Sequence, residues 1–514
     1  FKELTHTECI ALAQRVLFFY YMVKNQFEKS LSLLQESLTY YTDLRERIAV
    51  ADTLEMIGIY YYSNMIDYDQ ALAYFQKCLA IREKVKHTFG IARVYHFIAD
   101  VYSEIYENEL GLDYLQRSLN LMEQLQYENE IAWIYFKFGE YYTFKTEFSQ
   151  ATNFIQKSLT LFNKVKNQKG IATCYMRLGG LALVNGDFTK AQKYQEQSIQ
   201  LWNELKIRTL GYGVAIGNLG WVKRELGQLD ESLECFQKFL TVGEELGKRC
   251  EIAQALQEIG TIYRLKGKYK QAFKLYQRGI SIQRKLAGNY YVDGQKGWNC
   301  YCLTVLITQY FPEENALQYV KELEQIHGRN EWNEQAYPVA KALYLKTSKR
   351  VRDHYKAQEI LEKAIKETSC FDPVIGFTAH LSLCELLIRE LRTSGEEEVF
   401  QEVKTLVDDI QTTLTQQNIV PLQIEMQILQ AKIQQIQGDF DQSVNFLEQA
   451  IQQAKTNDLV DMMNKIQREQ DFLEETFDTW QKLIQNNAPF QERLKQAQLE
   501  DYVKTAVKRV NLER

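Results

Sequence analysis

The chain has 514 residues, of which 45% are hydrophobic and 25% charged, and its formal net charge is −6. This composition suits a folded protein that buries a core, and the mild acidity excludes the basic footprint of a nucleic-acid binder. The presence of only 5 prolines favours helix after helix joined by short turns. No apolar stretch reaches the roughly 18 residues of a membrane helix, so no span is expected.

Residue types that carry chemistry are present but form no recognisable site. The nine cysteines are scattered through helical stretches and are interpreted as small buried residues of a protein in a reducing, cytoplasmic compartment. Cys300 and Cys302 form the one close pair and lack the spacing or nearby histidine of a metal site. A phosphate-binding loop follows a strand, but no strand is predicted before the Gly-rich segment 211–217. We therefore expect a non-enzymatic protein with no catalytic, cofactor or metal site.

The spacing of residues along the chain predicts a tandem array of repeats. An anchor residue follows a polar turn every 40 or 41 residues, and Asn108 is the one polar member of the set: Phe27, Tyr68, Asn108, Phe148, Phe188, Leu229 and Tyr269. A small residue precedes most anchors by nine positions, as at Ala99, Gly139, Gly179, Gly220 and Gly260. A fixed period in this range is typical of a solenoid.

Each period predicts a pair of helices, here called A and B. Apolar residues recur at helical spacing on both sides of a polar turn such as Asn185-Gly186-Asp187, where Gly186 can adopt the left-handed conformation that ends helix A. The small residues, including Ala191 and Ala272 of helix B, are interpreted as packing positions. One helical hairpin cannot bury both of its faces, so the units must stack.

These positions resemble the tetratricopeptide repeat family. The matching residues are Tyr175, Leu178, Gly179, Phe188, Ala191 and Tyr194 in one unit, and Ile259, Gly260, Tyr263, Tyr269, Ala272 and Tyr276 in another. The repeat length is similar to that of the long-repeat subgroup, which includes kinesin light chains and the spindle-orientation adaptors rich in Leu-Gly-Asn. The resemblance covers residues 8–288 and returns at 424–456. It implies an all-α, right-handed solenoid whose A helices line a concave groove.

The groove positions carried over from the family give the candidate partner-binding residues. They are Arg93, His96, Trp133, Phe136, Glu140, Met176, Asn218, Trp221, Arg224, Gln254, Gln257 and Arg264. Trp133 and Phe136 are equally compatible with a place in the core between repeats. Arg224 and Arg264 have no evident structural role in the sequence, which favours function. Asn218 matches the position where long-repeat adaptors bind peptide backbone, but other units carry Lys137, Arg177 and Glu258 there.

Four segments are predicted: seven repeats over 1–288, diverged helical repeats or a spacer over 289–423, one repeat over 424–456, and an amphipathic hairpin over 457–514. The last begins with a heptad seam over 459–484, and the run 486–489 breaks its helix. A hairpin that caps the open end of the solenoid is favoured, and self-association through the seam is the alternative.

Two functions are compatible with these features. The leading one is a scaffold or adaptor that binds a partner protein or peptide in the groove. The second is a regulatory sensor, whose array binds a small ligand or signalling peptide and controls an effector domain outside this chain. The chain begins with Phe rather than Met, which leaves room for such a segment upstream.

Overall fold

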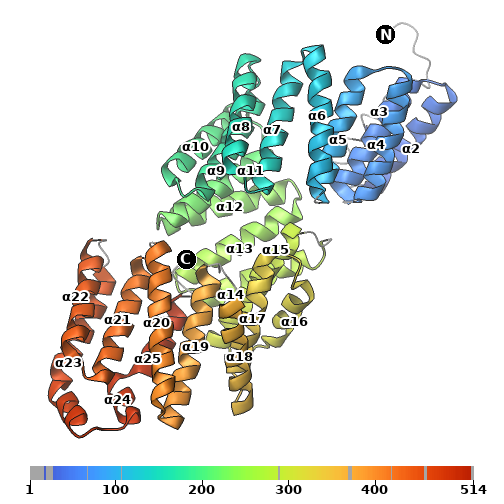
Figure 1. Ribbon diagram of the computed structural model, residues 1–514. Coiled ribbons are helices and arrows are strands. Elements are labelled where there is room, and N and C mark those ends of the chain that lie inside the picture. The colour runs from blue at the N-terminus through green and yellow to red at the C-terminus, as the bar shows by residue number, and fades with distance from the viewer. Residues whose placement is uncertain are drawn as a thin grey trace. The chain divides into compact units, whose positions relative to one another are not determined.

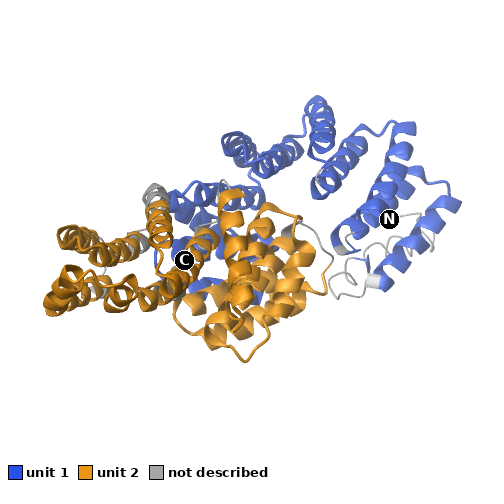
Figure 2. Ribbon diagram, turned by 60° about the horizontal axis from the view of Figure 1, so that its bottom comes forward, with its two compact units in different colours: residues 1–242 blue, residues 243–514 orange. Residues whose placement is uncertain are grey.

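The computed structural model describes residues 17–18, 27–65, 67–105, 107–286, 290–367, 373–417, 420–456 and 460–510. Every regular element in these ranges is a helix, so the all-α prediction is confirmed (Figure 1). None of the helices in the described ranges combines the length and apolar character needed to cross a bilayer. The chain divides into two compact units, 1–242 and 243–514, which are described separately (Figure 2). This division differs from the four segments expected above, which stay predictions about repeat type.

Unit 1 is a series of A and B helices, and each A helix described packs against the B helix that follows it (Figure 1). A single turn of π-helix, η1 (Tyr61–Met65), extends α3. The α-helices of this unit are α2 (Phe27–Asp43), α3 (Arg47–Tyr60), α4 (Tyr68–Lys84), α5 (Thr88–Glu104), α6 (Asn108–Leu125), α7 (Glu128–Phe144), α8 (Phe148–Lys164), α9 (Gln168–Val184), α10 (Phe188–Leu205), α11 (Leu210–Glu225) and α12 (Leu229–Glu245), the last of which crosses the division.

The anchor residues mark the starts of the B helices. Each of the seven anchors is the first residue of its helix, in α2, α4, α6, α8, α10, α12 and, in unit 2, α14 (Tyr269–Gln283). Aspartates before two of them cap the helix: Asp67 accepts from the Gln70 amide at 3.0 Å and Asp187 from the Lys190 amide at 3.1 Å. The sequence period therefore records a recurring helix start, and the predicted hairpins are confirmed.

Close packing explains the small residues of the pattern. A Cβ atom placed on Gly139 would lie 3.2 Å from the Ala151 carbonyl oxygen of the next helix, so a larger residue would force the pair apart. Ala191 and Ala272 are completely buried, as expected for packing positions. Gly186 has φ +73°, the left-handed conformation predicted at the end of helix A.

Unit 2 continues the alternation of helices without the regular anchors. Its helices after α12 and before the C-terminal region are α13 (Arg249–Leu265), α14, α15 (Tyr290–Tyr310), α16 (Leu317–Ile326), α17 (Glu331–Lys346), α18 (Val351–Glu367), α19 (Pro373–Ser394), α20 (Glu397–Gln417), α21 (Val420–Gln437) and α22 (Phe440–Thr456). Phe440, which follows the turn at Gly438, starts α22 as the earlier anchors start theirs.

The C-terminal region differs in one respect from a simple end cap. It consists of α23 (Val460–Gln485), α24 (Phe490–Ala497) and α25 (Leu499–Val510), and α23 packs on α22. The other two turn back and pack on α19 and α21, which are A helices (Figure 1). Leu494, Leu499 and Val503 are buried in this contact. The C-terminal helices thus cover a lateral face of the unit as well as following its last hairpin.

The heptad seam of residues 459–484 is used inside the chain. Its members Ile466, Leu473 and Trp480 are buried within unit 2, and Phe477 is partly exposed. Leu459 lies outside the described residues. Because the seam already packs on its own unit, these buried side chains offer no free surface for self-association in this fold.

Candidate partner-binding surface

The A helices of unit 1 carry a chain of ion pairs across their junctions. Asp100 of α5 lies 3.0 Å from the Lys137 ammonium of α7, and Lys137 lies 3.1 Å from Glu140. Glu140 pairs in turn with Arg177 of α9. We call this set, together with Glu55 and Arg93, the ion-pair ladder. The pairs Glu55–Arg93, Asp100–Lys137 and Glu140–Arg177 each join two neighbouring hairpins, so the ladder ties α3, α5, α7 and α9 to one another.

One end of the ladder rests on a buried arginine that the sequence analysis did not single out. Arg82 of α4 is 1% exposed and donates to the Gly90 carbonyl at 2.7 Å and to Asp52 at 2.9 Å. It also lies 2.8 Å from Glu55, which pairs with Arg93 of α5. Burial raises the pKa of Glu55 above its usual value, although both arginines lower it.

The middle of the ladder is charged at neutral pH. Burial by itself would raise the pKa of Glu140, but Lys137 and Arg177 outweigh it and hold that pKa at about 2. Burial by itself would lower the pKa of Lys137, but Asp100 and Glu140 keep it well above its usual value. The ladder therefore presents fixed charges of both signs.

Three of the predicted residues meet at one pocket. Arg93 and His96 of α5 and Trp133 of α7 line a cavity of about 150 Å³ between α5, α6 and α7. The other lining residues are Ala92, Phe97, Ser118, Met122, Glu130 and Ile134. Burial lowers the pKa of His96, although Asp100 nearby raises it. This cavity is called the α5–α7 pocket below.

The aromatic and methionine candidates divide between pocket and core. Phe136 is 4% exposed and Met176 is 7% exposed, which places both in the packing between hairpins. Trp133 rests edge-on against Phe162 at a ring distance of 4.8 Å and still lines the pocket. The core interpretation therefore holds for Phe136, whereas Trp133 serves both purposes.

The candidates on α11 are half-buried. Asn218 lies beside α9, since its side-chain nitrogen would be 3.6 Å from a Cβ atom on Gly180. Trp221 is also half-buried. Arg224 lies 3.0 Å from Glu225, so its charge has a local partner.

The remaining candidates belong to unit 2, and two of them are buried. Gln254 is half-buried, but Gln257 is 8% exposed and Arg264 is 3% exposed. The Tyr276 hydroxyl accepts a hydrogen bond from Arg264 and lies 3.0 Å from the Thr261 hydroxyl, which makes a buried polar cluster between α13 and α14. The expectation that Arg264 lacks a structural role is wrong, because a buried cation needs such partners.

The A helices of unit 2 carry similar pairs, and the chain's own C-terminus covers part of them. Lys346 lies 2.8 Å from Glu385, and Lys465 lies 2.6 Å from Glu425. The Tyr502 hydroxyl of α25 donates to Glu425 at 2.6 Å. Lys432 donates to the Ala497 carbonyl of α24 at 3.2 Å.

The spacing of charged residues in the sequence could have identified the ion pairs of the ladder. Asp100 and Lys137, like Glu140 and Arg177, are opposite charges separated by about one repeat on successive A helices. Such spacing places them side by side once the hairpins stack. The covering helices leave no comparable signal, because their contacts join distant parts of the chain.

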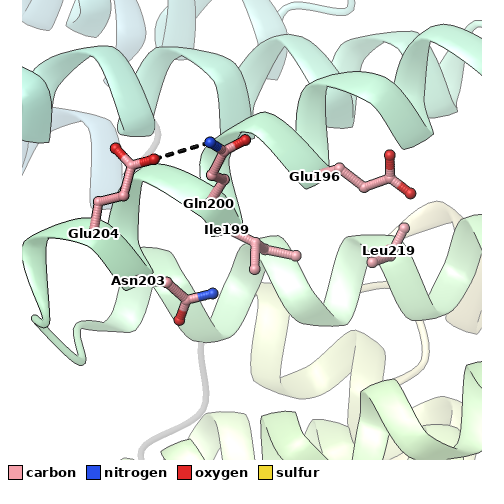
Figure 3. A pocket seen from close by; sticks show the side chains of 6 residues that line it. All are labelled: Glu196, Ile199, Gln200, Asn203, Glu204 and Leu219. Atoms are coloured by element: carbon pink, nitrogen blue, oxygen red, sulfur yellow. Dashed lines mark hydrogen bonds between the residues drawn. The ribbon is translucent and has the colours of Figure 1, made fainter.

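A wider hollow lies elsewhere on unit 1, between α10 and α11. It measures about 530 Å³ and is lined by Glu196, Ile199, Gln200, Asn203, Glu204 and Leu219 (Figure 3). Gln200 donates to Glu204 at 2.9 Å across its rim. None of the predicted groove residues lines it. Its polar groups come from the surface of one helix and converge on no single point, so it carries no assignment.

Side chains of the types that ligate metal ions are spread over the described ranges. There, no group of three or more His, Cys, Asp and Glu side chains is arranged to hold a metal ion. Cys300 and Cys302 are both buried, and burial raises the pKa of Cys300 far above its usual value.

Comparison with known proteins identifies the repeat. Models of the tetratricopeptide repeat match residues 50–85, 170–245 and 213–285, which is less than half of the chain. No curated protein sequence matches it.

Several solved structures match this chain at low sequence identity. A Rap protein complexed with competence and sporulation factor is 13% identical, with 77% of this chain and 99% of that chain covered at a TM-score of 0.46. The quorum sensor NprR from B. thuringiensis is 15% identical, with 78% and 99% covered at 0.43. Aspartyl phosphate phosphatase F from Bacillus subtilis is 14% identical, with 72% and 96% covered at 0.42. The family models and the helical hairpins together establish that this chain contains tetratricopeptide repeats.

Proposed function

We propose that the chain is a non-enzymatic scaffold or adaptor that binds a partner protein or peptide on the A helices of unit 1. The observation that supports this most is the combination of the ion-pair ladder with the α5–α7 pocket on consecutive A helices. Charged groups held in place and an adjoining apolar cavity are what specific peptide recognition requires. We call this surface the A-helix face; it comprises Arg93, His96, Trp133, Lys137, Glu140, Thr173 and Arg177.

The C-terminal helices cover part of the A helices of unit 2, which supports unit 1 as the place where a partner binds. On α19 and α21 the equivalent position is taken by α24 and α25, whose groups bond to Glu425 and Lys432. The chain thus provides an example of what an A-helix surface can hold: a helix with apolar residues and a hydroxyl group that reaches a buried carboxylate.

A matched pair of substitutions tests the proposal. Thr173 of α9 and Thr160 of α8 each donate to the carbonyl four residues earlier at 2.9 Å, and they lie on an A and a B helix respectively. The full chain is used to select binders from random peptides displayed on phage, and affinities are measured by fluorescence anisotropy.

Thr173→Arg is expected to lower the affinity for the selected peptides at least tenfold, because it introduces bulk and charge into the A-helix face. Thr160→Arg is expected to leave that affinity unchanged. Equal effects of the two substitutions, or no selected peptide at all, would overturn the proposal.

The finer assignments belong to this proposal as well. The repeat spacing of 40 or 41 residues supports the long-repeat subgroup similar to kinesin light chains. A reducing, cytoplasmic setting is supported by thiols such as Cys78 and Cys174, since burial raises the pKa of each to about 12 and keeps it unreactive. The acidic balance supports a protein rather than a nucleic-acid partner.

One observation favours the second function, a regulatory sensor. The contact of α24 and α25 with α19 and α21 is made by a segment that follows the break at Asn487 and Pro489. A ligand that competed for α19 and α21 would release this segment. Hydrogen exchange of residues 490–505 in the full chain would then accelerate when the ligand is added, and unchanged exchange would favour the scaffold.

A further inference from the structure

The α5–α7 pocket has the size and lining of a site for one apolar side chain. Its volume is about 150 Å³, and a dry cavity of about that size holds a benzene ring in another protein. Phe97, Met122, Trp133 and Ile134 are the large apolar residues of its lining. Trp133 is held by Phe162 behind it, so the wall is fixed before any ligand arrives.

The ionisable groups around the pocket differ in whether they are charged and paired. Arg93 is paired with Glu55, and its guanidinium also lies 6.0 Å from the centre of the Phe89 ring. His96 is neutral at pH 7, because burial lowers its pKa. The Glu130 carboxylate, at the start of α7, accepts a hydrogen bond from the side-chain amide of Asn129 at 3.2 Å. Glu130 lines the pocket, and no cation among the described residues pairs with it, so the rim carries one carboxylate without an ion-pair partner in that part of the chain.

We propose that the α5–α7 pocket binds an apolar side chain of the partner peptide whose neighbouring residue is Lys or Arg, with Glu130 as the contact for that cation. This rests on the proposed function and names the ligand for one part of the A-helix face. The apolar group displaces water from a wall of Phe97, Met122 and Trp133, and the adjoining cation pairs with a carboxylate beside it. An acidic neighbour would meet Glu130 and find no uncommitted positive charge at Arg93 or His96.

The chain offers a control that matches Glu130 closely. Glu128 lies in the same first turn of α7, so both carboxylates lie near the positive end of the helix dipole. Glu128 pairs with Lys164 and does not line the pocket. Glu130→Gln and Glu128→Gln therefore remove the same charge from the same helix end, and only the first changes the pocket. Melting temperatures of both variants check that the fold is intact.

The test uses the phage-selected peptides on the full chain. The enriched sequences are expected to share an apolar residue next to Lys or Arg. Replacing that basic residue by Gln, or Glu130 by Gln in the protein, should each weaken binding about threefold to fivefold, in the range of a partly exposed ion pair. The two changes together should cost no more than either alone, whereas Glu128→Gln should have no effect.

The outcomes separate this inference from the function on which it rests. Peptides that depend on Thr173 but lack the apolar–basic pair, or whose affinity is the same for Glu130→Gln and Glu128→Gln, would overturn the pocket assignment and leave the binding function standing. Additive effects of the peptide and Glu130 substitutions would overturn it too. A selection that yields no binder would overturn both.

Discussion

The Tyr502 hydroxyl of α25 donates a hydrogen bond of 2.6 Å to the Glu425 carboxylate of α21, although 77 residues separate the two. Glu425 is fully buried, and Lys465 approaches the same carboxylate at 2.6 Å. The C-terminal helix is therefore fixed to unit 2 by a specific polar contact in addition to its apolar residues.

This contact predicts the effect of removing one oxygen. Tyr502→Phe should lower the free energy of unfolding by about 1.5–3 kcal/mol, because a buried carboxylate loses a hydrogen-bond donor. Urea denaturation measures the loss, and hydrogen exchange should localise it to residues 490–505. Tyr355→Phe is the control, since Tyr355 is 53% exposed on α18. Equal stability of the two variants would show that the contact has no net effect.

The ladder predicts a pH dependence with a defined sign. The pKa of Glu140 is about 2 in the folded chain, below the ordinary value of 4.5, so its contribution is complete above pH 4.5 and declines as the pH falls toward 2. Glu140→Gln should cost about 2–3 kcal/mol at pH 7 and progressively less in acid.

Melting temperatures of wild type and variant across this pH range provide the measurement. Glu109→Gln, at an exposed position of α6, is the control. A difference between wild type and Glu140→Gln that stays constant with pH would contradict the ladder.

The two arginines first favoured as functional should behave differently. Arg264→Glu places a carboxylate where the native side chain is 3% exposed, and should cost at least about 3 kcal/mol. Arg224→Glu changes a half-buried side chain with a neighbouring glutamate, and should cost about 1 kcal/mol or less.

Chemical denaturation of the two single variants measures the free energy of unfolding of each. Similar losses for Arg264→Glu and Arg224→Glu would contradict the difference in burial between the two arginines. A combined variant that lost binding would report unfolding of unit 2 as readily as a damaged site.

The packing alanines predict a further stability effect. Ala191→Leu and Ala272→Leu should each cost about 1–3 kcal/mol, because both side chains are fully buried between helices. Thermal melting measures this, and Thr160→Leu on the exposed side of α8 is the control. Unchanged melting of both alanine variants would contradict the assignment of these residues to the joint.

Much of the fold could be predicted from sequence because the same joint recurs. The anchors Tyr68, Phe148 and Phe188 each begin a B helix, so one correctly interpreted unit predicts the others. Glycines such as Gly139 and Gly186 are fixed by local packing and backbone conformation, which depend on nearby residues. Local constraints repeat and are visible as a period.

The candidate partner-binding surface was harder to predict, because the exposure of its residues depends on segments that are distant in the sequence. A position on helix A is exposed only if nothing later in the chain returns to cover it, and Arg392 meets Glu500 across 108 residues. Arg93, His96 and Trp133, three of the predicted groove residues, line one pocket, and their role in binding stays a prediction. The sequence could not show that Arg264 is buried, because that depends on Tyr276 and the packing of α15.

The rungs of the ladder have a mechanical consequence. Asp100–Lys137 and Glu140–Arg177 each bridge two hairpins, so a change in the angle between neighbours must stretch at least one rung. These pairs are largely shielded from solvent, and mobile ions weaken them less than fully hydrated pairs. We therefore expect this part of unit 1 to resist flexing as a continuous stiff segment, and to hold that rigidity as ionic strength rises.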